Sequence, residues 1–459
     1  MSRKFRTANY EETLKQTIRL EEALPADHLA RFVVEIIGQL DLSKIYGQYA
    51  PKGGVAIAPE ILLGLLFYGY ATGIFSSRKI EIASYENIPM RYIAGGQHPD
   101  HDTIAHFRKT FLVQIKELFV QILVVAEAAG VLKLGNISLD GSKIHADASK
   151  SHAVSYKRLI ELERRLQSEV NEIFELSERA EQGEIELPDG LVLQDEIDIR
   201  QERLTNLSKA KAVLAERAKE RYEAEKAEYE AKVKEREEKV KKHRHKPRGR
   251  TPQPPQEQGP RDKDQYNFTD PESRIMKNAT NQGYDQHYNV QVATDQESLL
   301  IVAHALSNHP NDKQEAVPTL EALSPEVGKP DAMALDNGYF SEDNIQACQM
   351  RGIEPYIATG REPHHLDWHT FFAEQQQEPT EDASLKLKMA YKLRTEIGRA
   401  IYRLRKCTVE PVIGIIKEVL GFRQFSLRGL NAAAGEWCLV CLAFNLKRMH
   451  TLYLAQGLI

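Results

Sequence analysis

The feature that most constrains the fold is a succession of short apolar segments that begins near residue 270. HYNVQVATD and SLLIVAHALSN have the apolar pattern of strands, and DAMALDNGY and IEPYIATG follow as two more. Between and after these strands lie segments with helical spacing, namely NDKQEAVPTLEALSPEVG, SEDNIQACQMRG and the long AYKLRTEIGRAIYRLRKCTVEPVIGIIKEVLGF. Strands interspersed with helices in this way predict an α/β domain.

One further strand is expected far upstream, at GNISLDGSKIHAD. Two long stretches rich in Ala, Glu, Lys and Arg separate it from the other strands. We expect them to form the solvated helices of an antiparallel hairpin that turns at GEIELPDGLVL. The favoured interpretation is a charged helical arm that takes no part in catalysis. The stretch KKHRHKPRGRTPQPPQEQGP that follows is basic and then rich in Pro and Gln, which is typical of a disordered linker.

The first 130 residues have the pattern of an all-helical domain. DHLARFVVEIIGQLDLSKIY and APEILLGLLFYGYATGI carry apolar residues at helical spacing. Such a domain can bind DNA, although helix bundles have many other functions. The predicted organisation is a helical domain at 1–130, a first strand at 131–150, a helical insertion and linker at 151–262, and the rest of the α/β domain with C-terminal helices at 263–459.

Composition excludes some classes of protein but does not identify a binding partner. The net charge of −5 argues neither for nor against nucleic acid, because only local clustering of basic residues would be informative. Cys438 and Cys441 lie in the apolar helical run EWCLVCLAFNL, which favours buried thiols in a reducing compartment over a zinc site. The chain shows no signal-peptide pattern at its start and no uninterrupted apolar stretch of about 18 residues, so we expect a protein of the cytoplasm or nucleoid.

With the charged arm removed, the segments run β, β, β, α, β, α, β, α. This is the order of a ribonuclease H-like domain, in which a mixed five-stranded sheet has its first strand at the centre and its fourth strand parallel beside it. Asp140 lies on the first strand, Asp336 on the fourth, and Glu410 on the last helix. The three carboxylates are therefore expected to converge at the kind of position where open α/β sheets place their sites.

Three converging carboxylates repel one another and stay ionised together only beside cations. Their oxygen atoms suit Mg²⁺ or Mn²⁺. Two such ions can activate a nucleophilic oxygen and stabilise the leaving oxygen of a phosphodiester. We therefore take Asp140, Asp336 and Glu410 as the candidate catalytic residues and as candidate ligands of two metal ions.

Fragments spread over nearly the whole chain carry a family resemblance. They are PDHDTIAHFRK, SLDGSKIHADAS, DPESRIMKN, GYDQHYNVQVATD, NDKQEA, LDNGY and VEPVIGIIKEVLGFRQFSLRGL. In combination and order the sequence resembles the DDE transposases of bacterial insertion sequences, in the group around insertion sequence families four and five and closest to the insertion sequence 1182 group. The resemblance implies an enzyme that binds terminal inverted repeats and catalyses metal-dependent cleavage and strand transfer of DNA, with at least a homodimer in the active complex.

Each candidate carboxylate has a competitor. Asp147 lies in the same stretch as Asp140 and is its alternative. Because an Asn-Gly turn follows Asp336, this aspartate could instead simply begin a turn. Glu396 and Glu418 lie in the same helical stretch as the third. The resemblance favours the original three. The alternative functions are a ribonuclease H-like nuclease without strand transfer and an inactive derivative that only occupies DNA ends.

The signature Tyr-x2-Arg-x3-Glu-x6-Lys of this group fits only in its second half, where six residues separate Glu410 from Lys417. In the first half, Arg405 lies one residue before the expected place and Lys406 occupies it. Pro411 either kinks the helix that carries the glutamate or stands in the first turn of a helix that begins there.

Basic residues in and after this helix are candidates for DNA contacts. Lys417 follows Glu410 by about two turns and is expected on the same side of the helix. Arginines beside Phe422 and Phe425 suit a strand backbone and unstacked bases, although a packed structural turn is the alternative. The candidate DNA-binding residues are Lys417, Arg423, Arg428, Arg405 and Lys406, together with the basic tract at 241–250, for which a solvated linker is the alternative.

Overall fold

The structure is a computed structural model that describes residues 19–50, 54–188, 190–243, 251–255, 258–278, 283–360, 378–380 and 382–459. Most of the basic tract at 241–250 and part of the predicted linker lie outside the described residues. The chain forms two compact units, residues 1–147 with 275–459 and residues 148–274. Among the described helices, none combines the length and apolar composition that crossing a membrane requires.

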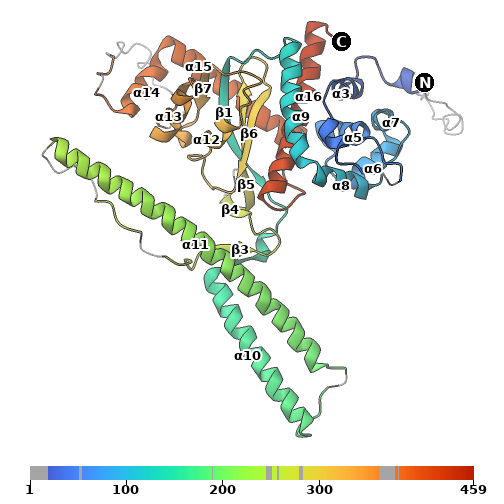
Figure 1. The fold of residues 1–459 in the computed structure, drawn as a ribbon, viewed down its shortest axis with the longest axis vertical. Coiled ribbons are helices and arrows are strands. Elements are labelled where there is room, and N and C mark those ends of the chain that lie inside the picture. The colour runs from blue at the N-terminus through green and yellow to red at the C-terminus, as the bar shows by residue number, and fades with distance from the viewer. Residues whose placement is uncertain are drawn as a thin grey trace, which may run out of the picture. The chain divides into compact units, whose positions relative to one another are not determined.

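A mixed sheet lies at the centre of the first unit (Figure 1). Its strands are β1 (Asn136–His145), β4 (Arg274–Lys277), β5 (Tyr284–Asp295), β6 (Ile301–Ser307), β7 (Ala332–Leu335) and β8 (Glu354–Ile357). They are ordered β4-β5-β1-β7-β8, with β6 also paired to β5. The β1 strand is antiparallel to β5 and parallel to β7, and β7 is parallel to β8.

The sheet corrects one detail of the sequence prediction, because the described residues contribute six strands to it and not five. The additional strand, β4, has only four residues, too few for an alternating pattern to stand out. The remaining strands follow the expected order, with β1 between β5 and β7. All four residues of β7 are buried, which is why the strand is continuously apolar and not alternating.

The helices that precede the sheet are short and close together in the chain. They are α2 (Leu20–Ala23), α3 (Leu29–Ile37), α4 (Ser43–Tyr46), α5 (Pro59–Ala71), α6 (Ser77–Glu86), α7 (Ile88–Ala94), α8 (His101–Thr110) and α9 (Leu112–Ala128). The C-terminal helix α16 (Leu430–Gln456) packs against α9, α5 and β6, so it joins these helices to the sheet (Figure 1). Cys438 and Cys441 are buried free thiols on α16, which confirms the expected core position.

The helices that follow the sheet strands are α12 (Ala316–Glu321), α13 (Glu342–Met350), α14 (Leu385–Arg394) and α15 (Glu396–Gly414). The predicted single long helix is thus broken at Thr395, whose hydroxyl caps α15 by accepting from the Gly398 amide at 3.0 Å. Pro411 lies inside α15, which continues into a π-helical turn at Ile415–Val419. Of the two alternatives for Pro411, a helix that begins there is excluded.

The second unit consists mainly of two helices, α10 (Tyr156–Glu181) and α11 (Leu193–His243), beside the short antiparallel pair β2 (Ala153–Ser155) and β3 (Gln265–Asn267). The helices run antiparallel, because Lys211 pairs with Glu163 and Arg200 with Glu169. Leu159 and three small or apolar residues of α11 form their buried core. The hairpin therefore has a narrow apolar seam and otherwise charged surfaces, as its composition indicates.

Candidate active site

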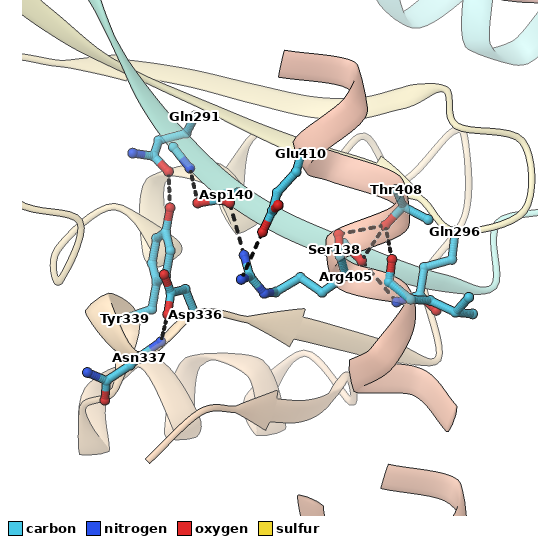
Figure 2. A network of polar contacts seen from close by, with 12 residues as sticks. Ser138, Asp140, Gln291, Gln296, Asp336, Asn337, Tyr339, Arg405, Thr408 and Glu410 are labelled. Atoms are coloured by element: carbon cyan, nitrogen blue, oxygen red, sulfur yellow. Dashed lines mark hydrogen bonds and ion pairs between the residues drawn. The ribbon is translucent and has the colours of Figure 1, made fainter. Parts of the chain in front are cut away.

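The two aspartates of the candidate site lie side by side because of strand register. In the parallel pair of β1 and β7, Leu139 is the partner of Leu335. Asp140 and Asp336 are the residues that directly follow this pair, so both lie where the short strand β7 ends. Figure 2 shows them on neighbouring segments, with Glu410 of α15 above them.

Helix α15 is fixed over β1 by a pair of hydroxyl groups. The Thr408 hydroxyl is 2.9 Å from the Ser138 hydroxyl, and the Gln296 amide donates to the same Ser138 oxygen at 2.9 Å. Ser138 and Asp140 are two residues apart on a strand and share one face, as Figure 2 shows. This contact therefore sets the height of Glu410 over the aspartates.

A buried arginine connects two of the three carboxylates. Arg405 donates from Nη1 to Asp140 Oδ2 at 2.9 Å and from Nη2 to Glu410 Oε1 at 3.2 Å (Figure 2). Its side chain is only 7% exposed, whereas that of Glu410 is 49% exposed. Burial opposes the charged guanidinium most strongly, but the carboxylates of Asp140, Asp336 and Glu410 together with Tyr402 outweigh it, so the pKa of Arg405 is raised.

Asp140 is held in a setting that disfavours its charge. Burial raises the pKa of Asp140 to about 6, against the opposing effects of Arg405 and of the Gly141 amide. The charges of Asp336 and Glu410 add to the increase, so all three carboxylates act on one another. The remaining oxygen, Oδ1, accepts the Gly141 amide at 2.8 Å.

A buried polar network lies beside the aspartates. The Tyr339 hydroxyl donates to Gln291 Oε1, and the Gln291 amide donates to Asp312 Oδ1 at 3.0 Å. Asn289 donates to the same Asp312 oxygen at 2.8 Å. Gly141 makes room for this network, because a Cβ at that position would overlap the Gln291 amide. The network therefore holds the segment after β7 against the centre of the sheet.

The pattern of the sequence does not predict this network. Gln291 and Asn289 alternate with valines along β5, so they have the appearance of a solvent-facing side of a strand, yet both are buried. Tyr339 resembled an ordinary turn residue after Asn-Gly. The glycine at position 141, inside an otherwise regular strand, is the one sequence signal of a close approach.

The competing acidic residues lie elsewhere or have other partners. Asp147 accepts from Arg428 at 2.8 Å, and Glu418 pairs with Arg423. Glu396 lies in the first turn of α15. The structure thus brings Asp140, Asp336 and Glu410 together, while their catalytic role stays a prediction.

The candidate DNA-binding residues have different surroundings. Lys417 donates to the Ser142 hydroxyl at 3.0 Å, and burial lowers the pKa of its ammonium group. Arg423 and Arg428 are more than half exposed and lie in ion pairs, and Lys406 is exposed on α15. Arg405 differs from all of these, because it is buried among the carboxylates. Its contact with DNA, like theirs, stays a prediction.

The acidic side chains converge, but they are not arranged as a formed metal-binding site. Among the residues that the structure describes, no group of three or more His, Cys, Asp or Glu side chains is arranged to hold a metal ion. The guanidinium of Arg405 lies between two of the candidate ligands.

A mixed α/β sheet with acidic residues on adjacent parallel strands and on a covering helix is consistent with the ribonuclease H-like class. Residues 250–446 match the family model described as Transposase DDE domain, and residues 18–110 match the one described as Transposase domain (DUF772). The first match includes Asp336 and Glu410 but not β1 with Asp140. Together the two matches support a transposase of an insertion sequence. Neither a curated protein nor a solved structure matches the chain.

Proposed function

We propose that this protein is a DDE transposase that cuts and joins the DNA ends of an insertion sequence, with a ribonuclease H-like catalytic domain. The observation that carries the proposal is the meeting of Asp140, Asp336 and Glu410 from three separate elements, two of them within the region that matches a transposase DDE domain. We place it in the group around insertion sequence families four and five, closest to the insertion sequence 1182 group.

The donor set fits Mg²⁺ or Mn²⁺. Asp140, Asp336 and Glu410 supply only carboxylate oxygens, which hard divalent cations prefer. Burial is the main cause of the raised pKa of Asp140, and the charges of Asp336 and Glu410 add to it. These three residues would hold two ions. When bound, the ions supply electrostatic stabilisation of charge on the oxygens of the reacting phosphodiester.

The reaction needs little covalent chemistry from the protein. Water attacks the scissile phosphorus and loses a proton, the bond to the 3′ oxygen breaks, and that oxygen takes up a proton, which leaves a 3′-OH and a 5′-phosphate. The freed 3′-OH then attacks a phosphodiester of target DNA. A new phosphorus–oxygen bond forms, and the bond from that phosphorus to the target's own 3′ oxygen breaks, which leaves a 3′-OH on the target strand. The main role of the protein is therefore to position the reacting groups. The Ser138–Thr408 contact and the Tyr339–Gln291 network perform it by fixing α15 and the end of β7 around the aspartates.

The DNA must be held on both sides of the scissile bond. Lys417, Lys406, Arg423 and Arg428 are proposed to contact its phosphates, since each lies on α15 or in the segments that directly follow it. The N-terminal helices are proposed to bind the terminal inverted repeats, and the basic tract at 241–250 to contribute phosphate contacts. Two copies of the chain would bring two ends together in the cytoplasm, at the nucleoid.

A product analysis with labelled DNA ends and Mg²⁺ or Mn²⁺ separates the candidate functions. A transposase yields both nicked or cut ends and products in which the 3′ end has joined target DNA. A nuclease without strand transfer yields only the cut ends. An inactive end-binding derivative shifts the DNA in a gel and yields neither product. Only the first outcome agrees with the proposal.

A further inference from the structure

Arg405 occupies the place between the first and third carboxylates that a cation bridging them would take. Its two terminal nitrogens divide between Asp140 and Glu410, at 2.9 and 3.2 Å (Figure 2). The other oxygen of Asp140 is already used by the Gly141 amide. Each oxygen of Asp140 therefore already accepts one hydrogen bond, and the Arg405 guanidinium occupies the side of the carboxylate that faces Glu410.

One guanidinium partly compensates the charge of the two carboxylates that it contacts. A buried carboxylate is costly unless a positive charge lies against it, and the Arg405 side chain, at 7% exposure, provides that charge from within the chain. The guanidinium also lies 6.0 Å from the centre of the Tyr402 ring, so one side of it is covered by an aromatic face. Arg405 thus acts as a cation for Asp140 that belongs to the chain itself.

We propose that Arg405 is the internal counter-cation of the metal-free site and that it must leave Asp140 before a divalent cation can bind there. The inference rests on the proposed function, because it takes the three carboxylates as the metal ligands. It adds a residue whose position excludes the metal, and the arginine acts by positioning and takes no part in the chemical steps.

The arginine can leave without moving the helix that carries it. α15 is held on β1 through Thr408, three residues further along, and that contact does not involve the guanidinium. Arg405 Nε is buried and donates to no group among the described residues, so its present position leaves one donor unused. Glu410 is about half exposed, which leaves the outer side of the ion pair open to solvent. The proposal therefore requires a change of the Arg405 side-chain rotamer and no movement of α15.

The full-length chain and two variants test the inference by Mn²⁺ binding, measured as loss of the electron paramagnetic resonance signal of free Mn²⁺. R405Q removes the competing charge and should bind Mn²⁺ about tenfold more tightly, which corresponds to about one charge-assisted hydrogen bond. The Mn²⁺ affinity of R405K should lie between those of R405Q and the natural chain, because an ammonium group cannot bridge both carboxylates as the planar guanidinium does. R403Q removes an exposed arginine from the same helix and should bind Mn²⁺ as the natural chain does.

Metal-free stability provides the second readout. R405Q should melt at a lower temperature than the natural chain in the presence of a chelator, and the increase in melting temperature on adding Mn²⁺ should be larger. If R405Q does not fold, R405K carries the test with the same two measurements. A structure of the natural chain with Mn²⁺ should show the Arg405 guanidinium away from Asp140.

Three results would overturn the inference: an unchanged or weaker Mn²⁺ affinity in both Arg405 variants, an equal gain in R403Q, or a metal-bound structure that keeps the Arg405–Asp140 bond. Failure of the proposed function looks different. In that case Mn²⁺ binding would be the same in D140N and D336N as in the natural chain, which would place the metal away from these carboxylates.

Discussion

At the scale of single residues, Asp140 lies in a setting that disfavours its charged form. Burial raises the pKa of its carboxyl to about 6, although Arg405 and the Gly141 amide both oppose the increase. A raised carboxyl pKa means that the folded chain holds the proton more tightly than the unfolded chain does. The resulting stabilisation is fully present below the unfolded pKa of about 3.8 and is lost as the pH rises through about 6.

Because the pKa of Asp140 is raised, the D140N substitution should change the stability of the protein in a chelating buffer by an amount that depends on pH. Because Asn resembles the protonated acid, the variant should be more stable than the natural chain at pH 7.5 by about 3 kcal/mol, which is the pKa shift from 3.8 to about 6 at about 1.4 kcal/mol per unit. The difference should shrink toward zero near pH 4. Urea denaturation at the two pH values measures it. D147N, whose carboxylate pairs with Arg428, is the control and should not share this pH dependence. A D140N variant less stable at pH 7.5 than at pH 4, relative to the natural chain, would contradict the account.

Gly141, the neighbour of Asp140, is constrained by space and not by its backbone angle. A Cβ there would overlap the Gln291 amide, so G141A should displace Gln291 from Tyr339 and Asp312. We expect a loss of stability of about 1–3 kcal/mol, the usual cost of overpacking a buried site. G135A is the matched control, because the nearest atom to its Cβ would be 3.6 Å away. Equal stability of the two variants in chemical denaturation would refute the tight packing at Gly141.

At the scale of elements, the site depends on how α15 lies on β1. Thr408 is the contact: its hydroxyl reaches both Ser138 and the carbonyl oxygen of Leu404. Both residues are buried, and their mutual hydrogen bond adds to the other contacts of each, Ser138 with the Gln296 amide and Thr408 with the Leu404 carbonyl. The position of Glu410 over the aspartates follows from this contact.

T408V keeps the shape of the side chain and removes the hydroxyl. We expect a loss of about 1–2 kcal/mol, because Ser138 loses a partner in a buried setting. S138A should cost a similar amount, and the double variant should cost clearly less than the sum, because the two residues share one bond. A double-mutant cycle by chemical denaturation measures this. Strictly additive effects would show that the hydroxyl contact does not hold α15.

Much of this arrangement could be predicted from the sequence, and the exceptions have physical reasons. Periodicity indicates the strand succession that places Asp140 beside Asp336, because strand register fixes neighbours once the order is known. The extra strand β4 is too short to leave a pattern, and a break at Thr395 is hidden in a continuous helical pattern. The bridge by Arg405 depends on side-chain reach and burial, which spacing along the chain does not report.

At the scale of the whole molecule, the N-terminal helices and the sheet share one core through α16. Glu436 of α16 is fully buried and accepts from the Tyr70 hydroxyl at 3.1 Å and from the Ser426 and Leu427 amides at 2.9 and 3.0 Å. Tyr70 lies on α5, whereas Ser426 lies in the segment between Arg423 and Arg428. One carboxylate therefore connects the N-terminal helices to the segment proposed to contact DNA.

E436A should destabilise the first unit strongly, by about 3–5 kcal/mol, because it leaves buried Arg108, 3.8 Å away, without its carboxylate. Thermal unfolding followed by circular dichroism measures the loss. E396A, at an exposed position in the first turn of α15, is the control and should change stability by less than about 1 kcal/mol. A melting temperature of E436A equal to that of E396A would mean that the buried carboxylate does not join the two regions.

The central claim is that Asp140, Asp336 and Glu410 form the catalytic site of a DNA-cutting and DNA-joining enzyme. The measurement that tests it most directly is cleavage and strand transfer by D336N with labelled DNA ends and Mg²⁺, beside the natural chain and E396Q. The account predicts that D336N loses both reactions by at least about a hundredfold while still binding the DNA ends, and that E396Q retains both. Full cleavage by D336N would contradict the account.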